Sequence, residues 1–86
     1  MRLEKKCWPE SFEKILSGEK TFDVRLCDFE CNPGDTLVLK EWNPDKGSFT
    51  GRSLEKTVGF VSKLNELRYW PKEAVAQKGL QVISLK

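Results

Sequence analysis

The sequence predicts an α+β domain that is mainly β, with about five to six strands and one helix near the N-terminus. Three segments lead to this prediction. Residues 21–26 alternate apolar and polar side chains, as a strand with one buried face does. Residues 36–42 are rich in strand-forming apolar residues, and residues 9–17 carry apolar side chains at helical spacing. Turn residues separate the segments, so we expect a small barrel or half-barrel.

The helix is expected at residues 9–17. Pro9 suits the first helical position, and Trp8 before it is restricted to an extended backbone. An apolar stripe follows at helical spacing: Phe12, Ile15 and Leu16. Gly18 favours a helix end, because glycine readily adopts the left-handed conformation found there.

Residues 21–26 are expected to form a half-buried strand. Its apolar side chains point one way and its polar side chains the other: Phe22, Val24 and Leu26 against Thr21, Asp23 and Arg25. Further strands are expected at 3–7, at 36–42, at 49–52 continuing as 54–61, and at 80–85, with a hairpin turn at 43–47. Residues 62–70 are ambiguous, and 71–78 are typical of a short second helix or a turn.

Length and composition fit a single domain over residues 1–86. The net charge is only +2, so a surface that binds polyanions has to be local. No apolar run approaches the length of a membrane span, and the N-terminal residues lack the apolar stretch of a secretory signal. We therefore expect a cytoplasmic protein without a membrane partner.

The histidine and cysteine content limits the kinds of catalysis and metal binding that the chain could perform. The chain has no histidine, which excludes Ser-His triads, Cys-His pairs and other histidine-dependent catalysis. Its three cysteines, Cys7, Cys27 and Cys31, are an odd number that argues against a disulfide framework. Three thiolates are also one short of a closed structural zinc site. We expect free or buried thiols, and neither a metal nor a cofactor.

Several motifs resemble the ASCH family. Residues 18–25, Gly-Glu-Lys-Thr-Phe-Asp-Val-Arg, resemble its signature Gly-x-Lys-x-x-Glu-x-Arg, with Asp23 in place of the usual glutamate. Further matching elements follow in order: Lys6-x-Trp8-Pro9-Glu10-x-Phe12, Ser17-Gly18-x-Lys20-Thr21-Phe22, Gly34-Asp35-x-Leu37-x-Leu39-x-Glu41 and Thr50-Gly51-Arg52. The resemblance extends over residues 3–61 and 79–85, and is strongest to a small bacterial and phage subgroup described as RNA-binding and ASCH-like.

The resemblance implies a PUA-like pseudobarrel in which the polar face of the motif strand lines a cleft between the first helix and the barrel. It also implies recognition of RNA or of a modified nucleoside. Among similar proteins, one group hydrolyses the acetyl amide of N4-acetylcytidine and another is ribonuclease-like. Where the acetylcytidine hydrolases carry a threonine nucleophile, this chain has Asp23, and a carboxylate is a poor substitute in attack on an amide. Thr21 lies two residues earlier on the same face.

Residues expected to bind RNA or a nucleotide are Lys6, Trp8, Lys20, Thr21, Asp23, Arg25, Glu41 and Arg52. Lysine and arginine neutralise phosphate, and arginine also binds it bidentately or stacks on a base. Trp8 is a candidate stacking surface and is rated above Trp42, because it adjoins the start of the helix. Structural roles remain open for the same residues: an exposed lysine for Lys20, core packing for the tryptophans, and ion pairs of Arg25 with Asp23 or Glu41 and of Glu41 with Arg52.

Three functions therefore remain open. The main interpretation is a non-catalytic module that binds RNA or a nucleotide. The second is a small hydrolase acting on a modified nucleoside or on RNA, with Lys20 as its central group and Asp23 beside it. The third is a protein-interaction module, which predicts an exposed apolar patch, with Tyr69 and Trp70 as candidates.

Overall fold

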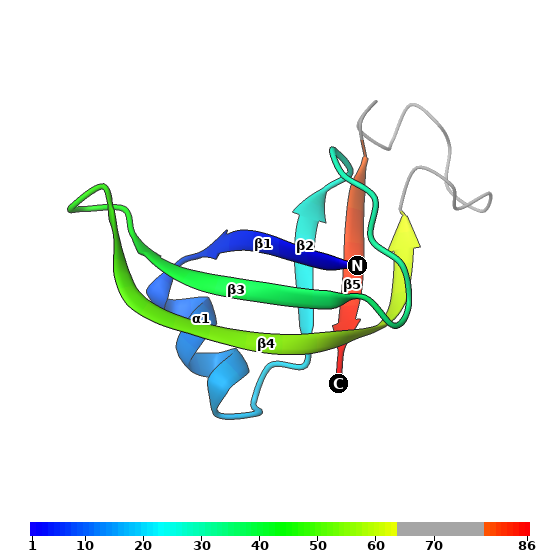
Figure 1. The fold of residues 1–86 in the computed structure, drawn as a ribbon, viewed down its shortest axis with the longest axis horizontal. Helices are drawn as coiled ribbons and strands as arrows, with labels where there is room; N and C mark the ends of the chain where they lie inside the picture. The colour runs from blue at the N-terminus through cyan, green and yellow to red at the C-terminus, as the bar shows by residue number, and fades with distance from the viewer. Residues whose placement is uncertain (64–78) are drawn as a thin grey trace.

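Five strands and one helix make up the described part of the computed structural model, residues 1–63 and 79–86 (Figure 1). In chain order they are β1 (Arg2–Cys7), α1 (Pro9–Leu16), β2 (Phe22–Leu26), β3 (Thr36–Asn43), β4 (Ser48–Lys63) and β5 (Leu80–Leu85). The expected α+β class, mainly β, is confirmed. The second helix expected at 71–78 and the patch at Tyr69 and Trp70 lie outside the described residues.

The strands form one mixed sheet in the order β1-β3-β4-β5-β2. β1 is parallel to β3, and the other neighbours are antiparallel. In Figure 1, β2 and β5 cross β1 and β3 steeply, and the long strand β4 bends to join the two groups. The two ends of the order, β1 and β2, do not pair with each other, so the curled sheet stays an open, pseudobarrel-like structure.

β4 is a single strand of 16 residues rather than the two separate segments expected. It remains continuous because two bulges absorb the irregular stretches. In the first, residues 50–52 lie opposite the single residue Glu41, and Gly51 adopts a φ of +96°. In the second, Gly59 and Phe60 lie opposite Ser84. A bulge bends and twists the strand that carries it, which suits a strand that turns from one half of the sheet to the other.

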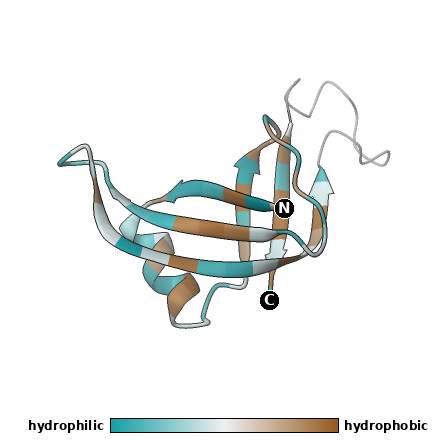
Figure 2. Ribbon diagram, viewed as in Figure 1, coloured by the Kyte–Doolittle hydropathy of each residue, from teal (hydrophilic) through white to brown (hydrophobic). Residues whose placement is uncertain are grey.

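The core lies between α1 and the concave side of the sheet. Phe12 and Ile15, two members of the predicted stripe, are 1% and 0% exposed, whereas Leu16 stays 52% exposed. The strands contribute Leu37, Leu39, Val58, Ile83 and Leu85, and the cysteines Cys7 and Cys31 fill the remaining space. Figure 2 shows the corresponding apolar segments in β3 and β5. Each large side chain buried in this way contributes about 1.5–3 kcal/mol to stability.

The end of α1 follows from Gly18, as predicted. Gly18 has a φ of +84°, which side chains other than glycine rarely adopt. Its N–H donates to the Ile15 carbonyl at 3.2 Å, and the Lys20 N–H donates to the Lys14 carbonyl at 2.9 Å. The loop after the helix is therefore held against the last helical turn.

The alternation predicted for β2 is confirmed, and the polar face of the strand, rather than the apolar face, is the one turned inward. Phe22, Val24 and Leu26 are 46%, 46% and 52% exposed, whereas Asp23 is 5% exposed. The polar face is turned inward because Arg25 satisfies it: its Nε donates to Asp23 Oδ2 at 2.7 Å, and its Nη2 donates to the Lys6 carbonyl of β1 at 2.6 Å. Arg25 thus bridges the two unpaired edges of the sheet.

Candidate functional site

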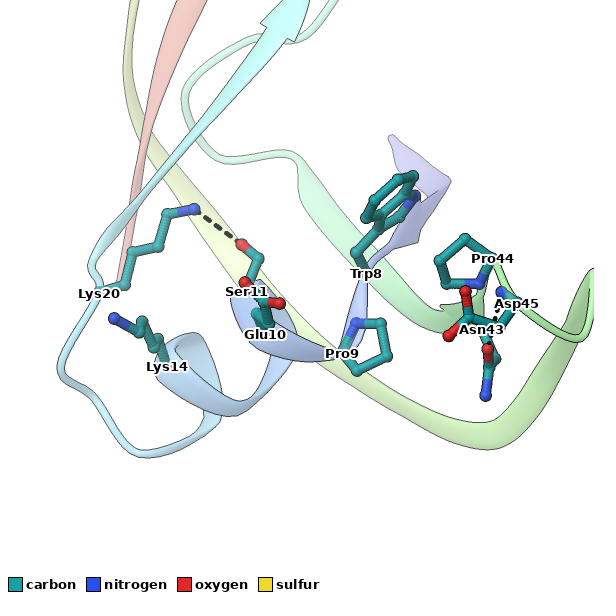
Figure 3. A pocket seen from close by; sticks show the side chains of 9 residues that line it. All are labelled: Trp8, Pro9, Glu10, Ser11, Lys14, Lys20, Asn43, Pro44 and Asp45. Carbon is teal, nitrogen blue, oxygen red and sulfur yellow. Dashed lines mark hydrogen bonds between the residues drawn. The ribbon is translucent and has the colours of Figure 1, made fainter.

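An open cavity of about 710 Å³ lies between α1 and the turn that joins β3 to β4 (Figure 3). It is lined by residues from the β1–α1 junction, the helix, the loop before β2 and the turn: Trp8, Pro9, Glu10, Ser11, Lys14, Lys20, Asn43, Pro44 and Asp45. We define the turn at residues 43–47 as the hairpin turn.

The parallel pairing of β1 and β3 explains why these segments meet. In this pairing Cys7 lies opposite Glu41, so β1 and β3 run in the same direction and finish at the same end of the sheet. Trp8 follows β1 directly, and the hairpin turn follows β3. Residues that are far apart in the sequence therefore line one cavity.

Two lysines line the cavity on the side of α1 and its following loop. The Lys20 ammonium donates to Ser11 Oγ at 2.7 Å, which anchors it to the first turn of the helix (Figure 3). Lys14 is exposed in the last helical turn, and its carbonyl accepts the backbone N–H of Lys20 at 2.9 Å. Within residues 1–63 and 79–86, no carboxylate lies within ion-pair distance of either ammonium group. Both charges therefore remain available to an anion.

Trp8 is the aromatic residue of the cavity. It precedes Pro9, and its backbone is extended, with φ −68° and ψ 152°, as the proline requires. The side chain is 62% exposed, far more than a core aromatic residue. Figure 3 shows it between the lysine side of the cavity and Pro44 of the hairpin turn.

Asn43, the first residue of the hairpin turn, stabilises the turn by accepting hydrogen bonds from later residues in it. Asn43 Oδ1 accepts the backbone N–H groups of Asp45 at 2.9 Å and Lys46 at 3.2 Å, and the Gly47 N–H donates to the Asn43 carbonyl at 2.8 Å. This is a local side-chain turn typical of asparagine. It fixes the backbone that carries Asp45 at the rim of the cavity.

Of the residues predicted from the sequence, Trp8 and Lys20 line the cavity, and the others lie elsewhere. Thr21 is exposed beside Lys20, and its carbonyl accepts the Leu85 N–H at 2.9 Å. Lys6 places its ammonium 3.8 Å from the ring centre of Trp42, a cation–π contact. Asp23 and Arg25 form the buried pair described above.

Glu41 and Arg52 form a second network away from the cavity. Arg52 binds Glu41 through both carboxylate oxygens, at 2.8 and 2.9 Å, and also contacts Glu13 of α1. Thr50 Oγ1 donates to the same carboxylate at 2.6 Å. The hydrogen bonds from Arg52 and Thr50 lower the pKa of Glu41 to about 2. The first bulge of β4 thus serves to surround a buried carboxylate, which fits a structural role for Glu41 and Arg52.

Cys7 directly precedes Trp8 in the sequence and is 4% exposed. Burial raises the pKa of its thiol, and contact with Ser11 offsets part of the rise. A buried thiol with a raised pKa is a weak nucleophile. In the described part of the chain, histidine, cysteine and acidic side chains form no group of three that would suit a metal ion, and no helix there is long and apolar enough to cross a membrane.

The sequence alone did not identify Ser11, Lys14, Asn43 or Asp45 as lining residues. Lys14 lies on the polar side of α1, six positions before Lys20, and only the position of the helix end shows that the two meet. The hairpin turn was expected as a turn, but the sequence does not reveal the parallel pairing that brings it to Trp8.

Comparison with known proteins places the chain in a family. The model of DUF3850, a domain of unknown function, matches residues 3–75. An uncharacterized 12.9 kDa protein of Escherichia phage P2, encoded in the GpA 3′ region, is 36% identical over 63 residues; the match covers 73% of this chain and 56% of that protein, so the chain spans just over half of its relative. The crystal structure of hypothetical protein PH0355 is similar in fold, with a TM-score of 0.69, 17% identity and coverage of 100% of this chain and 98% of that one. The chain belongs to the DUF3850 family.

Proposed function

We propose that the protein binds single-stranded RNA or a nucleotide in the cavity between α1 and the hairpin turn. The observation that carries this proposal is the combination, in one open cavity, of the exposed indole of Trp8 with the ammonium groups of Lys14 and Lys20. An aromatic face and nearby cations are the two elements that single-stranded nucleic-acid sites share.

Each element has a separate task. A base stacked on an aromatic side chain gains about 1–3 kcal/mol, and stacking requires a base that is not paired in a duplex. Lysine binds phosphate as a point charge without demanding one geometry, and a hydrogen bond from the Lys20 N–H to the Lys14 carbonyl holds the backbones of the two residues together. With a net charge of +2, the chain relies on this local pair rather than on a global field.

The proposal extends to the finer family assignment. The segment 18–25 resembles the ASCH signature, and its lysine, Lys20, is the residue that the fold brings into the cavity. The open, curled sheet is the arrangement expected of a PUA-like domain. We therefore propose that the protein belongs to the ASCH branch, with RNA or a nucleotide as its partner in the cytoplasm.

The binding residues of this proposal differ from the eight predicted from sequence. The Arg25 guanidinium is already hydrogen-bonded to Asp23 and to the Lys6 carbonyl. The Arg52 guanidinium is already hydrogen-bonded to the carboxylates of Glu41 and Glu13. Lys14 takes their place as the second cation. Arg25 and Arg52 are therefore assigned to the stability of the sheet, and Lys14 and Lys20 to the phosphate.

A titration with short single-stranded RNA at low and moderate salt tests the proposal. Wild type should bind in a saturable manner, and affinity should fall steeply with salt because phosphate contacts release counterions. Lys20→Ala and Lys14→Ala should each weaken binding and reduce the salt slope by about one. Lys86→Ala is the matched control, because Lys86 is exposed and does not line the cavity. Equal binding by all four proteins, or none by wild type, would contradict the proposal.

A second candidate function, hydrolysis, is favoured by one contact. Lys20 Nζ lies 2.7 Å from Ser11 Oγ inside the cavity, and lysine serves as the general base for serine in some hydrolases. In such a step the Lys20 ammonium would first release a proton to solvent, and Ser11 Oγ would then attack a carbonyl carbon while its own proton passes to the Lys20 amine. The proton would then pass to the leaving group, and water would release the acyl group from Ser11.

Ser11→Ala separates the two candidates. A binding site keeps most of its RNA affinity in this variant, because Lys20 and Trp8 remain. A hydrolase loses turnover of acylated nucleosides, together with the acyl adduct on Ser11 that mass spectrometry detects. If wild type shows neither turnover nor an acyl adduct, hydrolysis is ruled out and binding remains as the candidate function.

A further inference from the structure

Uncharged side chains form the outer surface of the half of the sheet made by β2, β5 and the end of β4, which lie next to one another in Figure 1. The strand register places them in adjacent rows: Val24 lies opposite Val82, and Ser62 of β4 continues that row. In the next row the Phe60 N–H donates to Ser84 Oγ at 2.7 Å. We define the outer face by these eight residues: Phe22, Val24, Leu26, Phe60, Ser62, Leu80, Val82 and Ser84.

The outer face exposes much of its apolar surface. Five of its six apolar side chains are 39–66% exposed: Phe22, Val24, Leu26, Phe60 and Leu80. Together they expose on the order of 400 Å², the size of patch that often marks an interaction site on a monomer. β2 cannot hide this surface by turning over, because its other side carries the buried pair of Asp23 and Arg25.

The charged residues nearest to the outer face lie at its edges. The Lys20 ammonium is 5.4 Å from the ring centre of Phe22, Lys86 lies beside Gly59 of the second bulge, and Asp28 follows Leu26 by two residues. An apolar centre with charged groups only at its rim is the arrangement found at protein–protein interfaces. Since 33% of the residues in the chain are charged, eight neighbouring positions without a charge set this surface apart from the rest.

The composition and the size of the outer face both fit a second copy of the chain as its partner. In a two-fold symmetric dimer a surface meets itself, so a charged surface repels its copy and an uncharged one does not. Two copies would bury about 800 Å² from the five exposed apolar side chains alone, and the remaining members and the rim bring the total to the roughly 1,000 Å² that a specific interface needs. A chain of 86 residues gains from such burial, because a small domain has a small core.

We propose that the outer face binds the same face of a second copy, and that the protein is a two-fold symmetric dimer. The inference goes beyond the proposed function, since none of the eight residues lines the cavity and RNA takes no part in the contact.

Sedimentation equilibrium of the full chain tests the proposal. Wild type should show twice the mass of one chain and should dissociate on dilution. Val24→Lys should raise the dissociation constant of the dimer at least about 100-fold, because the symmetry places two lysines near each other in an apolar interface. Ser53→Lys is the matched control: it adds the same charge at an exposed position of β4 in the other half of the sheet and should leave the dimer intact.

A pair of opposite charges tests the symmetry without relying on a loss. Val24→Glu should be monomeric by itself, as Val24→Lys should be, and circular dichroism should show both variants folded. An equal mixture of the two should restore the dimer, because a lysine of one copy then meets a glutamate of the other.

Three results would overturn the proposal. The first is a wild type that stays monomeric up to about 1 mM, which would assign the outer face to another partner. The second is a dimer that both Val24 variants retain, which would place the contact elsewhere. The third is a mixture of the two folded variants that stays monomeric, which would exclude the two-fold arrangement.

Discussion

Replacing Trp8 by alanine tests the stacking role of the cavity directly. Trp8 is 62% exposed, so the change removes only roughly 100 Å² of buried surface, and stability should fall by about 2 kcal/mol at most, without loss of the fold. Loss of one stacked base should remove about 1–3 kcal/mol of binding energy. Since about 1.4 kcal/mol is a factor of ten, the RNA dissociation constant should rise about 5- to 150-fold.

Fluorescence anisotropy of a labelled short RNA measures this change without depending on tryptophan emission. Trp8→Phe should lose less affinity than Trp8→Ala, because it keeps an aromatic face. Phe49→Ala is the aromatic control, since Phe49 is 48% exposed, packs against Trp42 and does not line the cavity. Unchanged affinity in Trp8→Ala, with wild-type binding intact, would refute the stacking argument.

Three further predictions concern the fold. Arg25→Ala should lower the free energy of unfolding by about 3 kcal/mol in a denaturant titration, because it leaves the Asp23 carboxylate buried without its partner; an effect below that of an ordinary surface change would refute the pairing. The pKa of the Glu41 carboxylate is lowered to about 2 from an ordinary 4.5, so the ionised group stabilises the fold above pH 4.5, and this contribution is lost as pH falls toward 2. Melting temperatures between pH 4.5 and 2 should therefore depend less on pH in Glu41→Gln than in wild type. Gly59→Ala should destabilise the protein by about 1–3 kcal/mol, because its Cβ would lie 2.6 Å from Ser84 Oγ, and the same change in a Ser84→Ala background should be less damaging.

Local signals in the sequence were sufficient for most elements. The helix was predicted because Pro9 and Gly18 act on the backbone at its two ends, and the apolar spacing between them settles which face is buried. The strands at 36–42 and 80–85 were predicted for a similar reason, since their composition and alternation do not depend on distant partners.

The buried side of β2 was not predictable in the same way. Alternation gives the period of a strand, but which side faces the core depends on what the polar side chains meet. Asp23 is buried because Arg25 pairs with it and reaches the carbonyl of Lys6, a contact between strands that are distant in the sequence. The apolar face with Phe22 was left to solvent as a consequence.

The candidate site was predictable only in part. Trp8 and Lys20 stood out because their motif resembles one that surrounds a cleft. Lys14, Asn43 and Asp45 did not, since their positions follow from the end of α1 and from the parallel pairing of β1 with β3. The parallel pairing leaves no local pattern in the sequence, and Gly18 marks where the helix ends without showing that the following loop folds back onto Lys14.

Mapping of RNA binding by NMR tests the central claim most directly. A short single-stranded RNA is added to the ¹⁵N-labelled protein, and the backbone and indole N–H signals are followed to saturation. The account predicts that the indole signal of Trp8 and the amides of Lys14, Lys20 and Asp45 shift together, while those of the exposed face of β2 at Val24 stay in place. Shifts confined to that face, or no shift at any RNA concentration, would contradict a binding site between α1 and the hairpin turn.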